Sequence, residues 1–244
     1  MIKQALLNYK IQSKKVYLNT KNFFKPEIFV KLADSKSEIK QAQKLRYQVF
    51  FSDRNKKKIL NISNFRKDSD KYDSYCDHVI VNYKHSKFSK NKVIGTYRLL
   101  QQKVAEKKIG FYSAEEFCLD KLIQSDEYTN MLELSRSCIS QKFRNRNVLK
   151  LMWREIYNYI NTNKIDGMFG TASFLEIDIQ KINNQLLFLQ QNYKMPENIR
   201  VKARKNCRAK IDYSKNIELN LKLVKSLPTL IKAVSYTHLR AHET

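Results

Sequence analysis

Apolar and polar residues are arranged along the chain in a pattern that predicts strands separated by helices. Apolar runs of strand length predict strands over 27–33, 78–83, 92–100, 131–139 and 165–171. A further strand is expected over 198–204, after Pro196. A polar stretch joins the 78–83 and 92–100 runs, which therefore predict an antiparallel pair.

Helical spacing of apolar residues predicts three longer helices. Ile39, Ala42, Leu45 and Val49 share one face of a helix that Asp34 or Ser35 caps and that extends through Phe51. Two more amphipathic helices are expected over 148–160 and 177–191, and a short helical turn over 113–117. Residues 52–75 form a polar stretch without such spacing, and a loop of that length is usually functional or disordered. The order of elements is compatible with an α/β domain.

Charged residues interrupt two of the predicted strands. Glu133 and Arg136 lie inside the run 131–139, and Arg98 lies near the end of the run 92–100. Charges are almost never fully buried unless they are paired, and burying them costs several kcal/mol otherwise. Because side chains alternate along a strand, Glu133 and Arg136 should face opposite sides unless a bulge lies between them. Ionisable groups that converge on an apolar sheet in this way suggest an active site.

Six co-linear motifs carry a resemblance to a known family. They are Leu45–Phe50, Asp70–Asp73, Cys76–Val81, Gly95–Leu100, Gly110–Phe117 and Glu133–Cys138. In these residues the chain resembles the bacterial ornithine N-acyltransferases, relatives of the acyl-homoserine-lactone synthases. The resemblance implies a GNAT-like acyltransferase fold with a central, mostly antiparallel sheet flanked by helices. It also implies transfer of a 3-hydroxyacyl group from acyl carrier protein to the α-amine of L-ornithine, which gives lyso-ornithine lipid.

Glu133 is the candidate general base. An ammonium must lose a proton before it can attack a thioester, and a buried carboxylate could accept that proton directly or through water. Distortion of the strand beside Glu133 would free backbone N–H groups for the developing oxyanion. The alternative is a structural ion pair of Glu133 with Arg136 or Arg98.

The remaining substrate-binding candidates follow from the same motifs. Asp70 and Asp73 suit the side-chain ammonium of ornithine, with an ordinary acidic turn as the alternative. Arg98 and Arg136 suit its carboxylate, because a guanidinium binds a carboxylate through two parallel hydrogen bonds. Two further candidates, Arg46 and Phe50, lie four residues apart and hence on one helix face.

The stretch 141–147 is expected to bind the phosphate of the acyl donor. It contains no glycine, whereas CoA-binding GNAT proteins use a glycine-rich loop for the pyrophosphate. Arg144, Arg146 and Asn147 could instead hold the single phosphodiester of an acyl-phosphopantetheine arm. This favours acyl carrier protein over CoA as the donor, with no tightly bound cofactor. A solvated basic turn is the alternative.

The composition is strongly basic, with a formal net charge of +24 and 42% hydrophobic residues. An acidic carrier protein, an anionic membrane or nucleic acid could each use such a charge. No zinc-finger spacing, RNP-like strand or basic zipper is present, so nucleic acid is not expected. Lysines scattered over solvated faces, reflecting a biased genome, would explain the charge equally well.

Cysteine usage and the absence of long apolar stretches predict a cytoplasmic protein. Peripheral contact with the inner face of the membrane is compatible with this prediction. Four cysteines are widely spaced without a C-x-x-C pair, so neither disulfides nor a metal site is expected. Cys138 is a conceivable nucleophile, but a free cysteine in an apolar run usually packs as a small hydrophobe. No stretch reaches the roughly 20 apolar residues that span a bilayer.

The two ends of the chain differ from its middle. Residues 1–25 predict a basic extension, residues 26–233 the acyltransferase domain, and residues 234–244 a tail of foreign composition that we interpret as a sequencing-adapter artefact. The domain is expected to lack C-terminal strands of the family.

Two other functions are compatible with these motifs. An acyl-homoserine-lactone synthase would share them, but such enzymes normally have a tryptophan after the position of Phe50, and the one tryptophan here is Trp153. A non-catalytic basic protein of the same fold, binding membrane or nucleic acid, would show salt-sensitive binding without turnover.

Overall fold

The computed structural model describes residues 25–52, 66–144, 146–174, 176, 178–214, 221–228 and 230–232. The chain divides into two compact units, and each is described by itself. Unit 1 comprises the described parts of Met1–Leu100 and Leu134–Lys164, and unit 2 those of Gln101–Glu133 and Ile165–Thr244. The predicted basic extension, apart from residue 25, and the predicted foreign tail lie outside the described residues.

The elements follow the predicted order. The strands are β1 (Glu27–Leu32), β2 (Asp77–Lys84), β3 (Lys92–Gln101), β4 (Phe117–Cys118), β5 (Met131–Ile139), β6 (Gly167–Phe169) and β7 (Lys202–Ala203). The α-helices are α2 (Lys36–Tyr47), α3 (Gln102–Val104), α4 (Asp120–Ile123), α5 (Arg146–Asn163), α6 (Ile179–Asn192) and α7 (Leu221–Ser226). Short 3₁₀ turns are η2 (Lys71–Ser74), η4 (Tyr112–Glu115), η5 (Gln141–Phe143) and η6 (Lys205–Cys207), and π-helical turns are η1 (Gln48–Ser52) and η3 (Ala105–Ile109).

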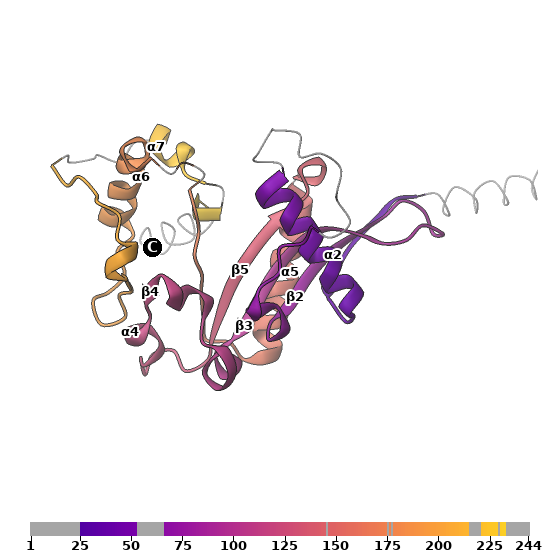
Figure 1. Cartoon of the computed structure of the whole chain (residues 1–244), viewed down its shortest axis with the longest axis horizontal. Coiled ribbons are helices and arrows are strands. Elements are labelled where there is room, and N and C mark those ends of the chain that lie inside the picture. Colours follow the sequence, from indigo (N-terminus) through magenta and orange to yellow (C-terminus); the bar gives the residue numbers. More distant parts are fainter. Residues whose placement is uncertain are drawn as a thin grey trace, which may run out of the picture. The chain divides into compact units, whose positions relative to one another are not determined.

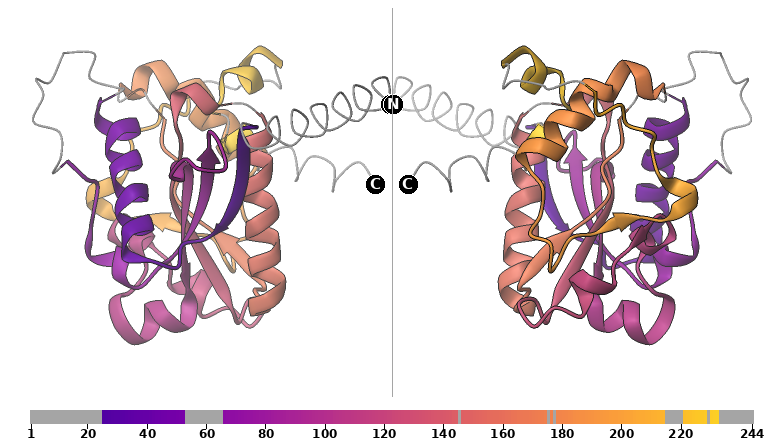
Figure 2. Two further views of the ribbon diagram at one scale, coloured as in Figure 1. Left: turned by 90° about the vertical axis from the view of Figure 1, so that its right-hand side faces the viewer. Right: turned by 90° about the vertical axis from the view of Figure 1, so that its left-hand side faces the viewer.

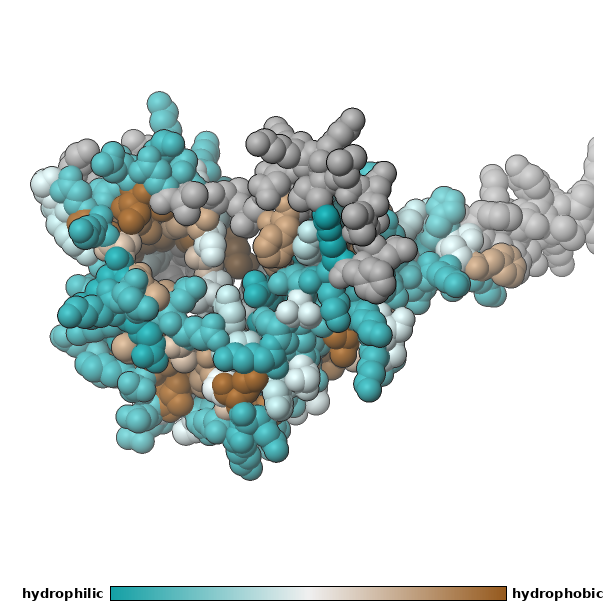
Figure 3. Space-filling model, viewed as in Figure 1, coloured by the Kyte–Doolittle hydropathy of each residue, from teal (hydrophilic) through white to brown (hydrophobic). Residues whose placement is uncertain are grey.

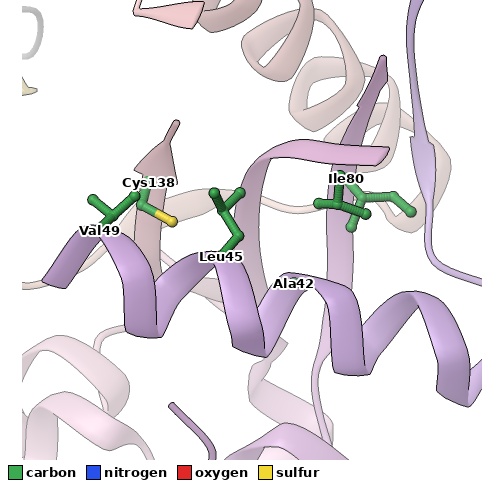
Figure 4. Close-up of a cluster of buried hydrophobic side chains, with 6 residues drawn as sticks. Ala42, Leu45, Val49, Ile80 and Cys138 are labelled. Atoms are coloured by element: carbon green, nitrogen blue, oxygen red, sulfur yellow. The ribbon is translucent and has the colours of Figure 1, made fainter. Parts of the chain in front are cut away.

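The main sheet has the strand order β1-β2-β3-β5-β6, and β2 and β3 form the antiparallel pair that the sequence predicts. In unit 1, helices α2 and α5 cover opposite faces of the strands (Figures 1 and 2). The α2 face is apolar because Ala42, Leu45 and Val49 project onto Ile80 and Cys138 (Figure 4). On the other face α5 approaches closely over Gly95, where an added Cβ would lie 3.2 Å from the sulfur of Met152.

Helix α2 begins as predicted and ends differently. The Ser35 side chain accepts a hydrogen bond from the backbone N–H of Glu38, which makes Ser35 the N-cap. After Tyr47 the helix widens into the π-helical turn η1 instead of continuing as an α-helix through Phe51. Such turns insert an extra residue into the helical repeat. Phe50 lies in this turn, half-buried against the apolar cluster of α2.

In unit 2 the strands near the end of the chain are shorter than predicted. β6 is only three residues long, and just before it the Asp166 side chain accepts hydrogen bonds from the Thr129 and Asn130 backbones. The predicted strand 198–204 reduces to β7, which pairs with β4 in a separate two-stranded sheet. Its expected first residues form a turn after Pro196, whose carbonyl accepts from Ile199.

Two clusters of described side chains lie in the core of unit 2. Leu122, Met131 and Ile199 form one, and Phe188, Val224 and Leu227 form the other, between α6 and α7. The described side chains in the face drawn in Figure 3 are largely hydrophilic, with apolar ones in small separate patches. Among the described helices, none is both long enough and apolar enough to cross a membrane.

Candidate active site

A cluster of buried arginines and aspartates occupies the α2 side of unit 1. Arg46, fully buried on α2, donates from Nη1 and Nη2 to the two carboxylate oxygens of Asp73 at 2.7 and 2.8 Å. Its Nε donates to Asp68 Oδ2 at 2.9 Å, and its Nη2 also contacts the Asp68 carbonyl oxygen. Asp73 further accepts from Gln43 and from the backbone N–H of Asp70. Asp73 is therefore held by protein donors on both oxygens.

Asp70 joins this cluster to the strands. Its side chain caps the turn η2 by accepting from the Tyr72 backbone, and it also accepts from Arg98 Nη1 at 2.6 Å. Asp70 thus forms the acidic turn that was the alternative to binding an ammonium, and it also pairs with Arg98. Arg98, on β3, donates from Nε to Ser135 Oγ at 3.0 Å and contacts Asp73 at 3.2 Å.

Arg136 is the third arginine of the cluster. Its Nη2 lies 3.4 Å from Asp70 Oδ2, and its Nε lies 3.6 Å from Asp68 Oδ2. The cluster thus combines three arginines with three aspartates, so that its formal charges balance. Nearly all of it is sealed from solvent, but the side chains of Asp70 and Arg136 are 23% and 26% exposed. Asp70 and Arg136 form the outer pair of the cluster, and the contact between their side chains is long. They are the part of the cluster that a ligand can reach.

The charge balance fixes the protonation of the buried groups. Burial disfavours ionisation of Asp73, but the hydrogen bonds and charge of Arg46 outweigh it and hold the Asp73 pKa well below its usual range. His78, on β2, is buried and its Nε2 lies 3.1 Å from the Asp73 carbonyl oxygen. Burial, aided by the nearby arginines, lowers the pKa of His78. His78 is therefore neutral, and it adds no charge to the cluster.

The backbone of β5 is distorted at Arg136. Its φ is 53°, in the left-handed region that L-residues avoid. As a consequence, two successive side chains reach the same cluster, because Ser135 accepts from Arg98 while Arg136 contacts Asp70. In a regular strand they would point to opposite faces. The local backbone, not the length of the arginine alone, brings Arg136 to the aspartates.

Glu133, in unit 2, is buried and contacts main-chain donors. Its Oε1 accepts from the Ser113 N–H at 2.6 Å and its Oε2 from the Tyr112 N–H at 2.9 Å. These N–H groups belong to the first turn of η4, so the carboxylate satisfies donors that the short helix leaves open. Among the described residues Glu133 forms no ion pair, so the alternative of a pair with Arg136 or Arg98 is wrong.

β5 and β6 separate directly after Glu133. The two strands pair in parallel only at Met131, Leu132 and Glu133. The described β6 ends at Phe169, whereas β5 continues to Ile139. The backbone of β5 beyond Glu133 therefore has no β6 partner in the described part of the chain. Unpaired strand backbone of this kind can hydrogen-bond an extended ligand.

Cys138 and Trp153, which the sequence analysis considered, both pack against other side chains. Cys138 is buried against α2, and burial raises the pKa of its thiol to about 12. A thiol that stays protonated packs as an apolar side chain and is not an activated nucleophile. Trp153 on α5 packs edge-on against Tyr97, with ring centroids 6.1 Å apart.

The predicted donor-phosphate residues lie at the start of α5, which begins at Arg146, two residues before the predicted start. Arg144 is exposed, and its Nε donates to the Ile139 carbonyl oxygen at 3.2 Å. Asn147 is exposed in the first turn. The side chain of Arg146 lies outside the described part of the structure.

Sequence reasoning missed three members of the cluster. Asp68, Gln43 and Ser135 each contact one of its arginines or aspartates. Asp68 carried a usable signal, since it precedes Asp70 by two residues in the same polar stretch. Gln43 lies three residues before Arg46 and thus on the same helix face, although nothing in its type indicated burial.

Comparisons with known proteins identify the family of the chain. A model of the GNAT acetyltransferase domain matches residues 45–154. The chain is 33% identical over 205 residues to L-ornithine N(alpha)-acyltransferase of Brucella abortus (strain 2308), which covers 83% of this chain and 73% of that protein. It is equally identical over 204 residues to the enzyme of that name from Rhizobium meliloti (strain 1021), covering 83% of this chain and 69% of that protein.

Solved structures add only a distant likeness. The acyl-homoserine-lactone (AHL) synthase LasI is 18% identical, with a TM-score of 0.38 over 58% of this chain and 70% of that one. At that score it supports no choice of function. The sequence relatives are far closer, and they cover most of both chains. The chain therefore belongs to the L-ornithine N(alpha)-acyltransferase family and is an N-acyltransferase with a GNAT domain.

Proposed function

We propose that this protein transfers a 3-hydroxyacyl group from acyl carrier protein to the α-amine of L-ornithine, forming lyso-ornithine lipid. The observation that carries the acceptor half is the outer pair of the cluster, Asp70 and Arg136. A free amino acid with a cationic side chain presents one positive and one negative group to such a pair. Asp70 binds the side-chain ammonium and Arg136 binds the carboxylate.

Replacement of the pair by a zwitterion is electrostatically balanced. The contact between Asp70 and Arg136 is long, at 3.4 Å, and both side chains are partly exposed. When a ligand with both charges enters, each residue exchanges one partner for another and neither is left unpaired. Arg98 and Asp73, sealed behind them, act as positioning residues in this proposal, and so does Arg46. Phe50 borders the apolar cluster of α2 and is proposed to contact the acceptor's carbon chain.

The reaction requires a neutral amine and a thioester bound within reach of it. The lone pair of the α-amine attacks the thioester carbon, the tetrahedral oxyanion collapses, and the thiolate leaves as the amine loses its proton. Thiols ordinarily have a pKa near 8.5, so the leaving group needs little protonation. Each oxygen of Glu133 retains a lone pair beyond its hydrogen bond to η4. We assign the proton to Glu133, directly or through one water.

The donor side rests on the separation of β5 from β6 and on the start of α5. The edge of β5 that faces β6 only as far as Glu133 is proposed to offer N–H groups to the pantetheine arm and to the oxyanion. Arg144, Arg146 and Asn147 are proposed to hold its single phosphate. Acyl carrier protein is the donor in this proposal because the basic chain contains no glycine in the stretch 141–147 that precedes α5.

Product analysis tests the proposal. The protein is incubated with 3-hydroxyacyl carrier protein and ornithine, and N-acyl-ornithine is measured by mass spectrometry. We expect product with ornithine and at least tenfold less when D70N replaces the wild type. D34N is the matched control, because Asp34 is 74% exposed and its ion pair with Lys31 lies at the surface. Acyl-homoserine lactone from S-adenosylmethionine, with no acyl-ornithine, would refute the proposal.

A further inference from the structure

Residues 200–210 form a basic ridge on unit 2. The ridge consists of Arg200, Lys202, Arg204, Lys205, Arg208 and Lys210, and no acidic residue lies among them. All are exposed except Arg200, which is half-buried. The apolar residues that alternate with the first cations point inward, since Ile199 and Val201 belong to a core cluster of unit 2. The ridge is therefore a cationic surface whose first apolar neighbours, Ile199 and Val201, pack into unit 2.

The arginines of the ridge are held in place by the main chain. Three arginines each donate a hydrogen bond from Nε to a backbone carbonyl oxygen. The pairs are Arg200 with Met195 at 2.9 Å, Arg204 with Ala114 at 2.7 Å and Arg208 with Ala203 at 3.1 Å. Within the described residues neither Arg204 nor Arg208 forms an ion pair. Their terminal nitrogens are thus pre-positioned donors that no intramolecular carboxylate neutralises, and a fixed guanidinium suits a carboxylate partner.

The ridge is attached to the short helix that Glu133 caps. The backbone N–H of Arg204 donates to the Glu116 carbonyl oxygen at 2.8 Å, and its side chain binds the Ala114 carbonyl oxygen. Ala114 follows Ser113, whose N–H binds Glu133. The proposed catalytic carboxylate and the ridge therefore lie on two sides of one four-residue turn, η4. A partner on the ridge would be bound next to the element that positions the proton acceptor.

The surrounding charges leave the surface cationic. Glu115 and Glu116 follow on the same turn, and Glu197 lies 4.0 Å from Arg200. Asp212 follows Lys210 by two residues, so six cations stand against four nearby anions. A bilayer is a poorer match than a protein, because membrane-binding surfaces combine cations with apolar side chains that insert. Here Ile199 and Val201, which alternate with the cations, pack within unit 2, and among the described residues near the ridge in sequence only Met195 and Tyr213 are large apolar side chains that are exposed.

We propose that the basic ridge is the docking surface for an acidic carrier protein that delivers the acyl thioester. The inference rests on the proposed function, since it assigns a place to the donor of that reaction. Carboxylates on the carrier pair with the ridge, which guides the encounter and holds the carrier while its pantetheine arm reaches the reaction centre. Such charge pairs act mainly on encounter and on binding, not on the chemical step.

The test compares a protein-borne donor with a protein-free one. In K202E/K205E, two exposed lysines with no side-chain contact among the described residues reverse their charge. We expect the apparent KM for the acyl carrier protein to rise about tenfold at low salt, with less effect as salt rises, and kcat to stay near wild type. The rate with acyl-pantetheine should not change, because that donor has no acidic surface.

Controls separate charge, folding and function. K36E/K40E makes the same charge change on α2, in unit 1, and should leave both donors unaffected. K205Q/K210Q avoids the strand and should give a smaller rise in KM if K202E/K205E does not fold. An unchanged KM for the carrier protein, or an equal loss with both donors, would overturn the docking proposal. Failure of the wild type with both donors would refute the proposed function, while binding of the carrier protein, measured directly, would still test the ridge.

Discussion

The left-handed backbone at Arg136 allows its geometry and its chemistry to be tested separately. R136A removes the guanidinium but keeps a Cβ at φ 53°, whereas R136G removes both. A Cβ in this region costs about 1 kcal/mol relative to glycine. The contacts of Arg136 with Asp68 and Asp70 are long and partly exposed, so their loss costs at most about 1 kcal/mol, equally in both variants.

The expected result is a difference in stability without a difference in activity. R136G should have a free energy of unfolding about 1 kcal/mol above that of R136A, which corresponds to about 2–4 °C in Tm for a chain of this size. Both should lose at least tenfold in kcat/KM for ornithine, because the group that binds the carboxylate is absent in each. Thermal unfolding and the product assay measure the two quantities on the same samples.

Lys164 supplies the control, since it is exposed, follows α5 and has φ 52°. K164G should gain stability over K164A by a similar amount, with wild-type turnover in both. The reasoning fails if R136A is as stable as R136G while the Lys164 variants differ as expected. It also fails if R136G keeps wild-type activity, because the guanidinium would then take no part in binding.

Three further predictions concern the buried carboxylates. R46M should lose about 3–5 kcal/mol in urea unfolding, since it leaves Asp73 charged and buried, and R46M/D73N should recover part of that loss. The pKa of Asp73 is lowered on folding, so its contribution to stability is complete above the unfolded pKa of about 4 and decreases as pH falls below that value. The free energy of unfolding should therefore depend less on pH in D73N during acid unfolding. Equal slopes of unfolding free energy against pH in D73N and the wild type would contradict this. In E133Q one backbone N–H of η4 would face an NH₂ group, which should lower the free energy of unfolding by about 1.5–3 kcal/mol. If Glu133 accepts the proton, turnover should fall well beyond the fraction of unfolded protein. A loss of turnover in proportion to the unfolded fraction would make Glu133 structural.

The sequence by itself determined the elements and the presence of buried charge. The run Met131–Ile139 was predicted with its observed bounds, and Ser35 was named as a possible cap, because strand length and capping are local properties. The sequence also predicted a bulge between Glu133 and Arg136 if both serve one site, and the described backbone departs from strand geometry at Arg136 itself. The family followed from motif order, and the sequence relatives confirm it.

Tertiary structure alone decided which groups pair. Glu133 binds backbone N–H groups of η4, about twenty residues earlier in the chain, and not the arginines that lie near it in sequence. Asp68 completes the charge balance of a cluster assembled from α2, η2, β3 and β5. The pairing of β7 with β4 is likewise between segments far apart in the sequence. A sequence states which charges must be neutralised, but their partners depend on how the chain packs, because hydrogen bonds between remote segments form only after the elements are assembled.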